Sequence, residues 1–265
     1  MEEQNHELQR GVDLLSSLLT VGNLFFGYIS ILSSARGTPA DLDFAAKAIG
    51  WAVLFDTLDG RVARLRKGAS PFGKELDSLA DVISFGIAPA FLALVWGLRG
   101  VRVEAAANPE LAMHIYQAGW IACFCFLICG AWRLARFNIL PATPTPDPGV
   151  HAHTHRDFIG MPIPAGAAVI AAIVHAFGDP LYDWRWAAAW TGLVLVLAAL
   201  MVSPIRYPSF KGGGLGGRHR SLIGIAALIA LIWFYSRPVL LVMAGGYLLI
   251  GLVGAVRRRL TGSHT

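Results

Sequence analysis

The sequence predicts an all-α protein that lies in a membrane as a polytopic bundle of about eight transmembrane helices. The first observation is composition: 55% of the 265 residues are hydrophobic, only 15% are charged, and the mean hydropathy is +0.55. Soluble globular proteins carry about 25% charged residues. The second is a series of apolar stretches long enough to cross a bilayer, and the third is a bias of Lys and Arg toward alternate connecting segments.

Each predicted helix is a mostly apolar stretch of about 20 residues. These stretches are roughly 14–34, 44–65, 76–98, 115–137, 160–177, 186–204, 221–236 and 238–256. The last two are separated only by Arg237 and Pro238, and proline suits the first turn of a helix. We expect one membrane domain over 1–265, in which 1–13 is a cytoplasmic N-terminal segment and 221–256 forms two additional C-terminal helices.

The positions of the basic residues predict the orientation of these helices. If the N-terminus is cytoplasmic, most of the 22 Lys and Arg residues fall on the cytoplasmic side, including the RRR at 257–259. Positive residues collect on that side of membranes. We therefore expect both termini in the cytoplasm, and we attribute the net charge of +5 to topology rather than to nucleic-acid binding. The polar start MEEQNHELQR predicts no cleavable signal peptide.

Four aspartates stand at the cytoplasmic ends of the second and third predicted helices, within FDTLDGRVARLRKGASPFGKELDSLADVISFG (55–86). Asp56 and Asp59 are three residues apart, and Asp77 and Asp81 are four apart, so each pair lies on one helix face. The short connection makes the two helices antiparallel neighbours, so both faces can point at one volume. Four carboxylates would repel one another there unless a divalent cation balances them. All-oxygen ligands suit Mg²⁺, Mn²⁺ or Ca²⁺, and we expect one or two such ions.

Small and basic residues accompany the aspartates. Gly60, Ala63 and Gly73 have almost no side chain, which lets a bulky ligand approach the backbone. Arg64 and its basic neighbours add positive charge. A metal site, small residues that leave space for a ligand, and nearby basic residues together predict a phosphorylated ligand. A pyrophosphate is the best match.

The aspartates have two other interpretations. Solvated helix ends would explain one or two acidic residues, but not four in spaced pairs with Gly and Ala between them. Intramembrane carboxylates also form ion or proton paths in transporters. A cation transporter therefore remains the alternative from a different functional class, and it predicts ion flux.

Three further features favour structural explanations. The cysteines of ACFCFLICG (Cys123, Cys125 and Cys129) are interpreted as small apolar packing residues. The histidines of the proline-rich 138–158 segment (His151, His153 and His155) are better explained by a solvated loop than by a metal site. The glycine-rich 211–217 segment lacks the G-x-x-x-x-G-K-[ST] pattern and is predicted to be a linker.

The aspartates belong to a longer pattern, D-x-x-D-G-x-x-A-R, eight residues, and then G-x-x-x-D-x-x-x-D. Its fixed positions are Asp56, Asp59, Gly60, Ala63, Arg64, Gly73, Asp77 and Asp81. The pattern resembles the signature of the CDP-alcohol phosphotransferase family at every fixed position. The resemblance implies a helical membrane enzyme, usually a homodimer, that uses a divalent metal and displaces CMP from a CDP-linked substrate with an alcohol.

Four other stretches look like the membrane-type CDP-diacylglycerol–serine O-phosphatidyltransferases of that family. They are LDSLADVISFGIAPA (76–90), GAWRLARFNI (130–139), FIGMPIPAGA (158–167) and MVSPIRYPSFK (201–211), and the resemblance covers most of 14–211. It implies transfer of a phosphatidyl group from CDP-diacylglycerol to L-serine in the cytoplasmic membrane of a prokaryote. The active site would face the cytoplasm among membrane lipids. Glycerol 3-phosphate, inositol phosphate or another alcohol remain alternative acceptors.

The resemblance also implies roles for individual residues. Asp56, Asp59 and Asp77 would bind metal, and Asp81 would reach the metal and act as the general base. Gly60, Ala63, Arg64 and Gly73 match positions that accommodate the CDP group. Thr20 and Asn23 on the first predicted helix would lie near the nucleotide, although helix packing explains them about as well. Arg133, Arg136 and Asn138 are candidates for binding serine, because Arg suits carboxylates, but the arginines could equally anchor the helix on its positive side.

Overall fold

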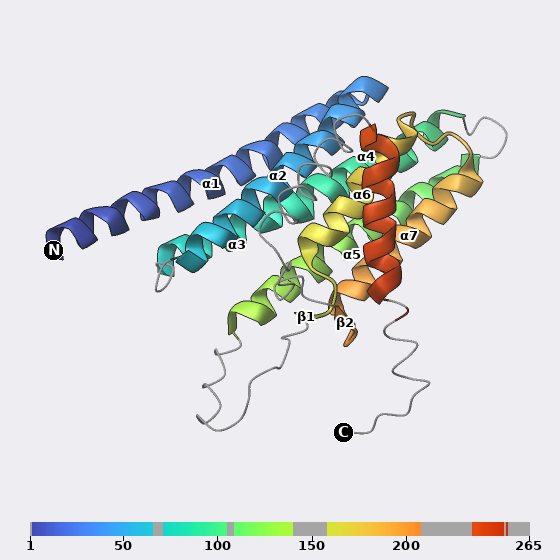
Figure 1. Cartoon of the computed structure of the whole chain (residues 1–265). Coiled ribbons are helices and arrows are strands. Elements are labelled where there is room, and N and C mark those ends of the chain that lie inside the picture. The colour runs from blue at the N-terminus through green and yellow to red at the C-terminus, as the bar shows by residue number, and fades with distance from the viewer. Residues whose placement is uncertain are drawn as a thin grey trace, which may run out of the picture.

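The computed structural model describes residues 2–65, 71–104, 109–139, 158–207, 235–251 and 253, and the statements below concern that part of the chain. The elements are α1 (Glu2–Arg36), α2 (Pro39–Leu65), α3 (Pro71–Asp81), the π-helix η1 (Val82–Ile87), α4 (Ala88–Glu104), α5 (Pro109–Ile139), β1 (Phe158–Ile159), α6 (Ile163–Phe177), α7 (Trp184–Val202) and β2 (Arg206–Tyr207). A C-terminal helix covers Tyr235–Gly251. Figure 1 shows the helices packed side by side as a bundle, with β1 and β2 together at one end.

Four described helical segments are long and apolar enough to cross a membrane. They are Leu15–Arg36, Phe72–Val101, Pro109–Asn138 and Trp184–Val202, and they coincide with the first, third, fourth and sixth predicted spans. The helix α6 and the C-terminal helix are apolar but shorter, while α2 is helical over the second predicted span but carries several charged residues. The seventh predicted span lies almost entirely outside the described residues. The protein is therefore a membrane protein, but the predicted count of about eight spans is not confirmed.

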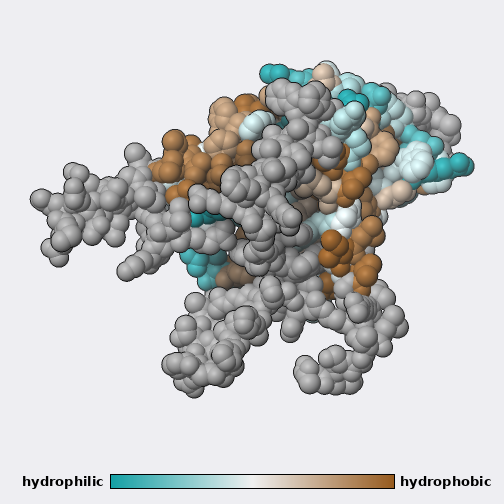
Figure 2. Space-filling model, in the orientation of Figure 1, coloured by the Kyte–Doolittle hydropathy of each residue, from teal (hydrophilic) through white to brown (hydrophobic). Residues whose placement is uncertain are grey.

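Large apolar side chains are exposed on the outside of the bundle, as is expected of residues that face lipid tails. They include Leu18 and Phe25 on α1, Trp120 on α5 and Trp186 on α7. Figure 2 shows brown, apolar surface along the flank of α1 and low on the side of α7, and teal, hydrophilic surface at the upper right end of the bundle. A surface of this kind would be unfavourable in water, so it supports the membrane assignment.

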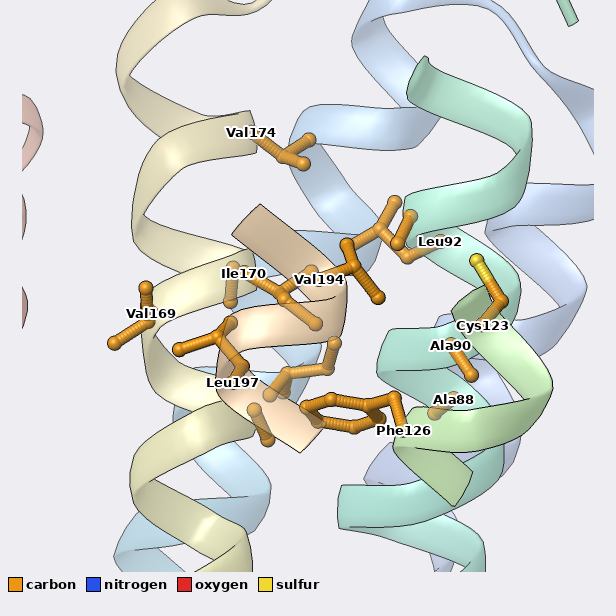
Figure 3. Packing of buried hydrophobic residues seen from close by; sticks show 14 of the residues in the cluster. Ala88, Ala90, Leu92, Cys123, Phe126, Val169, Ile170, Val174, Val194 and Leu197 are labelled. Atoms are coloured by element: carbon orange, nitrogen blue, oxygen red, sulfur yellow. The ribbon is translucent and has the colours of Figure 1, made fainter. Parts of the chain in front are cut away.

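The core fills the space between α4, α5, α6 and α7 (Figure 3). Leu92 of α4, Phe126 of α5, Ile170 of α6 and Leu197 of α7 are fully buried and belong to one cluster. Cys123 is buried in the same cluster, so its packing is that of an apolar residue, as predicted. This core holds the four helices against one another.

The helices α3, η1 and α4 follow one another without a break, and the run begins at Pro71, where proline is tolerated. The π-helix starts directly after Asp81, and π turns inside α-helices frequently occur at functional sites. Gly27 of α1 lies so close to this turn that a Cβ there would collide with Ser84. The Ser84 hydroxyl also donates a 3.0 Å hydrogen bond to the carbonyl oxygen of Asn23. Helix α1 is thus fixed against the turn that follows Asp81.

The two short strands join stretches that are far apart in the sequence. β1 pairs with β2 in antiparallel register, Phe158 with Tyr207 and Ile159 with Arg206. The amide of Gly160 donates to the carbonyl of Ile205 at 2.8 Å, and that of Met161 to the carbonyl of Leu200 at 3.0 Å. The all-α prediction did not include this pair. The family-like stretch 158–167 and the described part of 201–211, residues 201–207, therefore form one structural unit.

Gly160 is the most constrained position of this unit. Its φ is +80°, and a Cβ there would collide with the carbonyl oxygen of Met201. We expect Gly160→Ala to destabilise the protein by about 1–3 kcal/mol, because a strained backbone and a backbone collision are added together. Thermal unfolding in detergent measures the effect. Gly178→Ala is the matched control, since its φ is +74° but nothing lies within 4 Å of its Cβ. Equal losses in the two variants would show that the Met201 contact has no effect.

Candidate active site

Three carboxylates from two helices meet at one end of the bundle. Asp56 comes from α2, and Asp77 and Asp81 come from α3. One oxygen from each lies within 4.8 Å of the oxygens of the other two. Asp81 is buried, and Asp56 and Asp77 are half-buried. The i, i+4 spacing brings Asp77 and Asp81 onto the same face of α3, as expected.

Asp59 lies beside this cluster but is held by α1. It is buried, and the hydroxyls of Ser16 and Thr20 each donate a hydrogen bond to one of its two carboxylate oxygens. Its charge still acts on Asp77 and Asp81, so it belongs to the same electrostatic environment. The structure therefore gathers three carboxylates at one point and orients the fourth by hydroxyl groups.

Helix α1 supplies a row of polar side chains to the aspartates. Asn23 is buried and its Nδ2 donates to Oδ1 of Asp81 at 3.2 Å. Ser16, Thr20 and Asn23 follow one another at i, i+4 and i+7, which is one face of a helix. The sequence prediction placed Thr20 and Asn23 near the nucleotide, whereas here both bond to carboxylates. It missed Ser16, although the same spacing within an apolar stretch was a usable signal.

The carboxylate cluster fits a divalent cation. A Mg²⁺ or Ca²⁺ ion binds oxygen ligands at about 2.0–2.6 Å, so two oxygens on one ion are at most about 4–5 Å apart. The oxygens of the cluster lie within 4.8 Å of one another, so small side-chain adjustments bring all three onto one ion. All the donors are carboxylate oxygens, which excludes a preference for thiolate-loving metals. Asp56, Asp77 and Asp81 are thus the residues that could hold an ion.

The space beside the aspartates is open at Gly60. A Cβ built on Gly60 would meet no atom within 4 Å among the described residues. Gly73 lies in the first turn of α3. Ala63 and Arg64 lie in the last turn of α2, and their side chains fall outside the described part of the structure. Gly60 is exposed and leaves room for a side chain, whereas the hollow for a ligand next to the acidic face remains a prediction.

The three residues predicted to bind serine lie near the C-terminal end of α5, each in different surroundings. Arg133 is buried, lies with its guanidinium 5.5 Å from the centre of the Phe137 ring, and interacts electrostatically with Asp81. Arg136 is exposed. Asn138 donates a 2.8 Å hydrogen bond to the hydroxyl of Ser78, which links α5 to α3 between Asp77 and Asp81. Arg133 is the one of the three that is both charged and buried.

Two predictions fall on residues outside the described part. These are the histidine-containing segment with His151, His153 and His155, and the glycine-rich stretch 211–217. Both remain predictions.

Comparison with known proteins adds a family and several relatives. The sequence model described as CDP-alcohol phosphatidyltransferase matches residues 13–202. A CDP-diacylglycerol--serine O-phosphatidyltransferase of Helicobacter pylori is 34% identical over 245 residues, which are 91% of this chain and 90% of the relative. A protein of the same name from Methanocaldococcus jannaschii is 33% identical over 183 residues, 69% of this chain and 73% of the relative. An archaetidylserine synthase of Methanothermobacter thermautotrophicus is 35% identical over 202 residues, 76% of this chain and 72% of the relative.

Proposed function

The chain belongs to the CDP-alcohol phosphatidyltransferase family, and on that basis we propose that it transfers the phosphatidyl group of CDP-diacylglycerol to L-serine. The products are phosphatidylserine and CMP. The observation that carries the proposal is the meeting of Asp56, Asp77 and Asp81 within 4.8 Å, because these are fixed positions of the family signature. The relatives support serine as the acceptor. The name of one relative refers to diacylglycerol and that of another to an archaetidyl lipid, but both names specify serine. The two relatives therefore share the acceptor and differ in the lipid.

We assign the metal site to Asp56, Asp77 and Asp81, with Asp59 beside them. A bound Mg²⁺ or Mn²⁺ ion would supply positive charge at the pyrophosphate and at the departing CMP. The hydroxyls of Ser16 and Thr20 hold Asp59 in one orientation, so its negative charge stays next to the cluster. The open space at Gly60 would receive the CDP group together with Ala63, Arg64 and Gly73.

Asp81 is the proposed general base. The serine hydroxyl oxygen forms a bond to the phosphatidyl phosphorus, the bond from that phosphorus to the CMP oxygen breaks, and the hydroxyl proton passes to the Asp81 carboxylate. A base must lie within hydrogen-bond reach of the proton that it takes. Asn23 supports this role because it donates to one oxygen of Asp81 and limits rotation of the carboxylate. Thr20 and Asn23 thus act through the aspartates as positioning residues.

Arg133 is the proposed ligand of the serine carboxylate. It is buried near Asp81, so a serine bound by it would have its hydroxyl close to the base. Arginine binds carboxylates with two parallel hydrogen bonds. Arg136 is exposed, and the side chain of Asn138 is engaged with Ser78, so neither is as well placed as Arg133.

We expect Arg133→Gln to raise the apparent KM for serine by at least about tenfold, because hydrogen bonds to a charged group contribute about 1.5–3 kcal/mol. The KM for CDP-diacylglycerol should change little. Steady-state kinetics of CMP release measure both values. Arg136→Gln is the matched control, since it removes the same charge from an exposed position three residues away. Wild-type serine kinetics in Arg133→Gln would remove this residue from the acceptor site.

We expect Gly60→Leu to abolish binding of CDP-diacylglycerol while the protein still folds. A side chain at Gly60 enters open space, so it would obstruct a ligand without disturbing the packing. Binding of the nucleotide lipid and thermal stability are measured on the same sample. Gly192→Leu on α7 is the control, because its Cβ also meets nothing within 4 Å. Unchanged affinity in Gly60→Leu would contradict the proposed nucleotide position.

A panel of acceptors tests the reaction as a whole. Purified protein is supplied with CDP-diacylglycerol, a divalent metal and either serine, glycerol 3-phosphate or an inositol phosphate, and CMP release is followed. Release that depends on serine supports the proposal. Release with another alcohol would keep the chemistry and change the acceptor. Ion flux in vesicles without CMP release would support a cation transporter instead.

The proposal includes the setting of the reaction. We expect the aspartate end and both termini to face the cytoplasm of a prokaryotic cell, since most Lys and Arg residues lie on that side. The active form is expected to be a homodimer in the lipid bilayer. Cysteine accessibility tests the orientation, and native mass spectrometry from nanodiscs tests the dimer.

A further inference from the structure

A cavity lies between α2, α6 and the C-terminal helix, away from the aspartates. Its volume is about 560 Å³, which is within the range of ligand pockets. Small residues create the space, because α6 presents Ala165, Ala168, Ala171 and Ala172 to it. Leu240 and Met243 of the C-terminal helix form the facing wall. The walls are therefore apolar along most of their length.

Polar groups lie at one end of this cavity. His175 is buried, and its Nδ1 lies 2.5 Å from Asp43 Oδ1 while its Nε2 lies 2.9 Å from the hydroxyl of Ser236. Lys47 pairs with the other oxygen of Asp43 at 2.7 Å, and its side chain remains half-exposed. The next residue after Ser236 is the exposed Arg237. The polar end of the cavity thus carries the Lys47–Asp43 pair, with the imidazole of His175 and the hydroxyl of Ser236 beside it.

The cavity has the length of one lipid leaflet. Its lining runs from Ala165 to His175 on α6 and from Ser236 to Tyr247 on the C-terminal helix. At 1.5 Å per residue both stretches are about 15 Å long. The hydrocarbon core of a bilayer is about 30 Å thick, so about 15 Å is the depth of one leaflet. Asp43 precedes Asp56 by thirteen residues along α2, about 20 Å, so the polar end lies in the leaflet opposite the aspartate cluster.

We propose that this cavity binds a phospholipid of the leaflet opposite the active site, with one acyl chain between α6 and the C-terminal helix and its phosphate at Lys47. The apolar walls match a chain in length and chemistry. The half-exposed ammonium of Lys47 has three N–H donors, so it can bind a phosphate as well as Asp43. The bound lipid would bridge α2, α6 and the C-terminal helix, which His175 and Ser236 already connect. The site is independent of the reaction proposed above, and its test needs no turnover.

Photo-crosslinking in phosphatidylcholine nanodiscs tests the site. The probe is a phospholipid with a diazirine near the end of one acyl chain and an alkyne for recovery, and labelled peptides are mapped by mass spectrometry. Labelling should concentrate on residues 165–172 and 240–247. Ala168→Phe should reduce it by about tenfold or more, because a bulky side chain and a ligand cannot share the space. Ala189→Phe, at an exposed position of α7, should leave it unchanged.

The head group is tested with a diacylglycerol probe that has the same chains and no phosphate. Wild-type protein should prefer the phospholipid probe, and Lys47→Ala should reduce that preference by about two- to fivefold, as expected for one partly exposed charge pair. Labelling spread evenly over all lipid-facing helices, or unaffected by Ala168→Phe, would overturn the proposal. Equal labelling by both probes in wild-type protein would overturn the phosphate assignment.

Discussion

Replacing Asp56 with Asn should abolish phosphatidyl transfer, with a loss of at least about 10³-fold in kcat. The substitution keeps the size of the side chain but removes one of three carboxylates that lie within 4.8 Å of one another. The charge that a metal supplies to the transition state contributes several kcal/mol, and each 1.36 kcal/mol corresponds to about tenfold in rate. CMP release with excess Mg²⁺ or Mn²⁺ measures the loss, and Asp77→Asn should behave in the same way.

The matched control is Asp41→Asn at the opposite end of α2. Asp41 is paired with Arg36 at 3.5 Å near the helix start, so the chemical change is the same and the location differs. Its activity should stay near that of the wild type. Chelation should inactivate the wild-type protein reversibly, and Mn²⁺ binding should weaken in Asp56→Asn but not in Asp41→Asn. A near-normal rate in Asp56→Asn would exclude this residue from the metal site.

The sequence was sufficient to predict the cluster because its geometry is local. Two residues three or four apart share a helix face, and the short connection between α2 and α3 brings the two faces together. Asp77 and Asp81 follow this rule without correction. Apolar length likewise predicted the helices that overlap 14–34, 76–98, 115–137 and 186–204. Each of these predictions depends only on residues close together in the chain.

The orientation of Asp59 could not be derived in the same way. Its i, i+3 relation to Asp56 predicted four carboxylates at one point, but Ser16 and Thr20 bind it from α1. A carboxylate buried beside two hydroxyls gains more by accepting their hydrogen bonds than by adding to the repulsion in the cluster. The orientation of Asp59 therefore depends on how α1 packs on α2, and helix periodicity does not specify that packing. The same packing gives Asn23 its contact with Asp81.

The elements that sequence reasoning missed depend on pairing between distant segments. β1 and β2 are two residues each and have no periodicity, and each becomes a strand only because the other is present. The π-helix after Asp81 is fixed by the contact of Ser84 with α1. The C-terminal helix was predicted at 238–256, but its connection through Ser236 to His175 of α6 was not. In each case the deciding contact joins residues about 50 or more positions apart, or two different helices.

Replacing Asp81 with Asn should reduce kcat by about 10²–10⁴-fold, which is the usual contribution of a general base. Binding of CDP-diacylglycerol should be largely kept, because the carboxylates of Asp56, Asp59 and Asp77 would still hold the metal beside the nucleotide. The amide is close in size to the carboxylate, so the buried site need not repack. Single-turnover CMP release measures the chemical step, and equilibrium binding of the lipid is measured on the same preparation.

Asn23→Ala tests whether Asp81 acts as the general base or only as a metal ligand. Asn23 touches Asp81 through one oxygen, so its loss frees the carboxylate to rotate but leaves its charge in place. If Asp81 acts as the base, Asn23→Ala should lower kcat by a smaller factor than Asp81→Asn and leave Mn²⁺ affinity almost unchanged. If Asp81 serves only as a ligand, Asp81→Asn should instead lose Mn²⁺ and CDP-diacylglycerol together, and high metal concentration should restore the rate. Restoration of that kind would assign the proton transfer to another group.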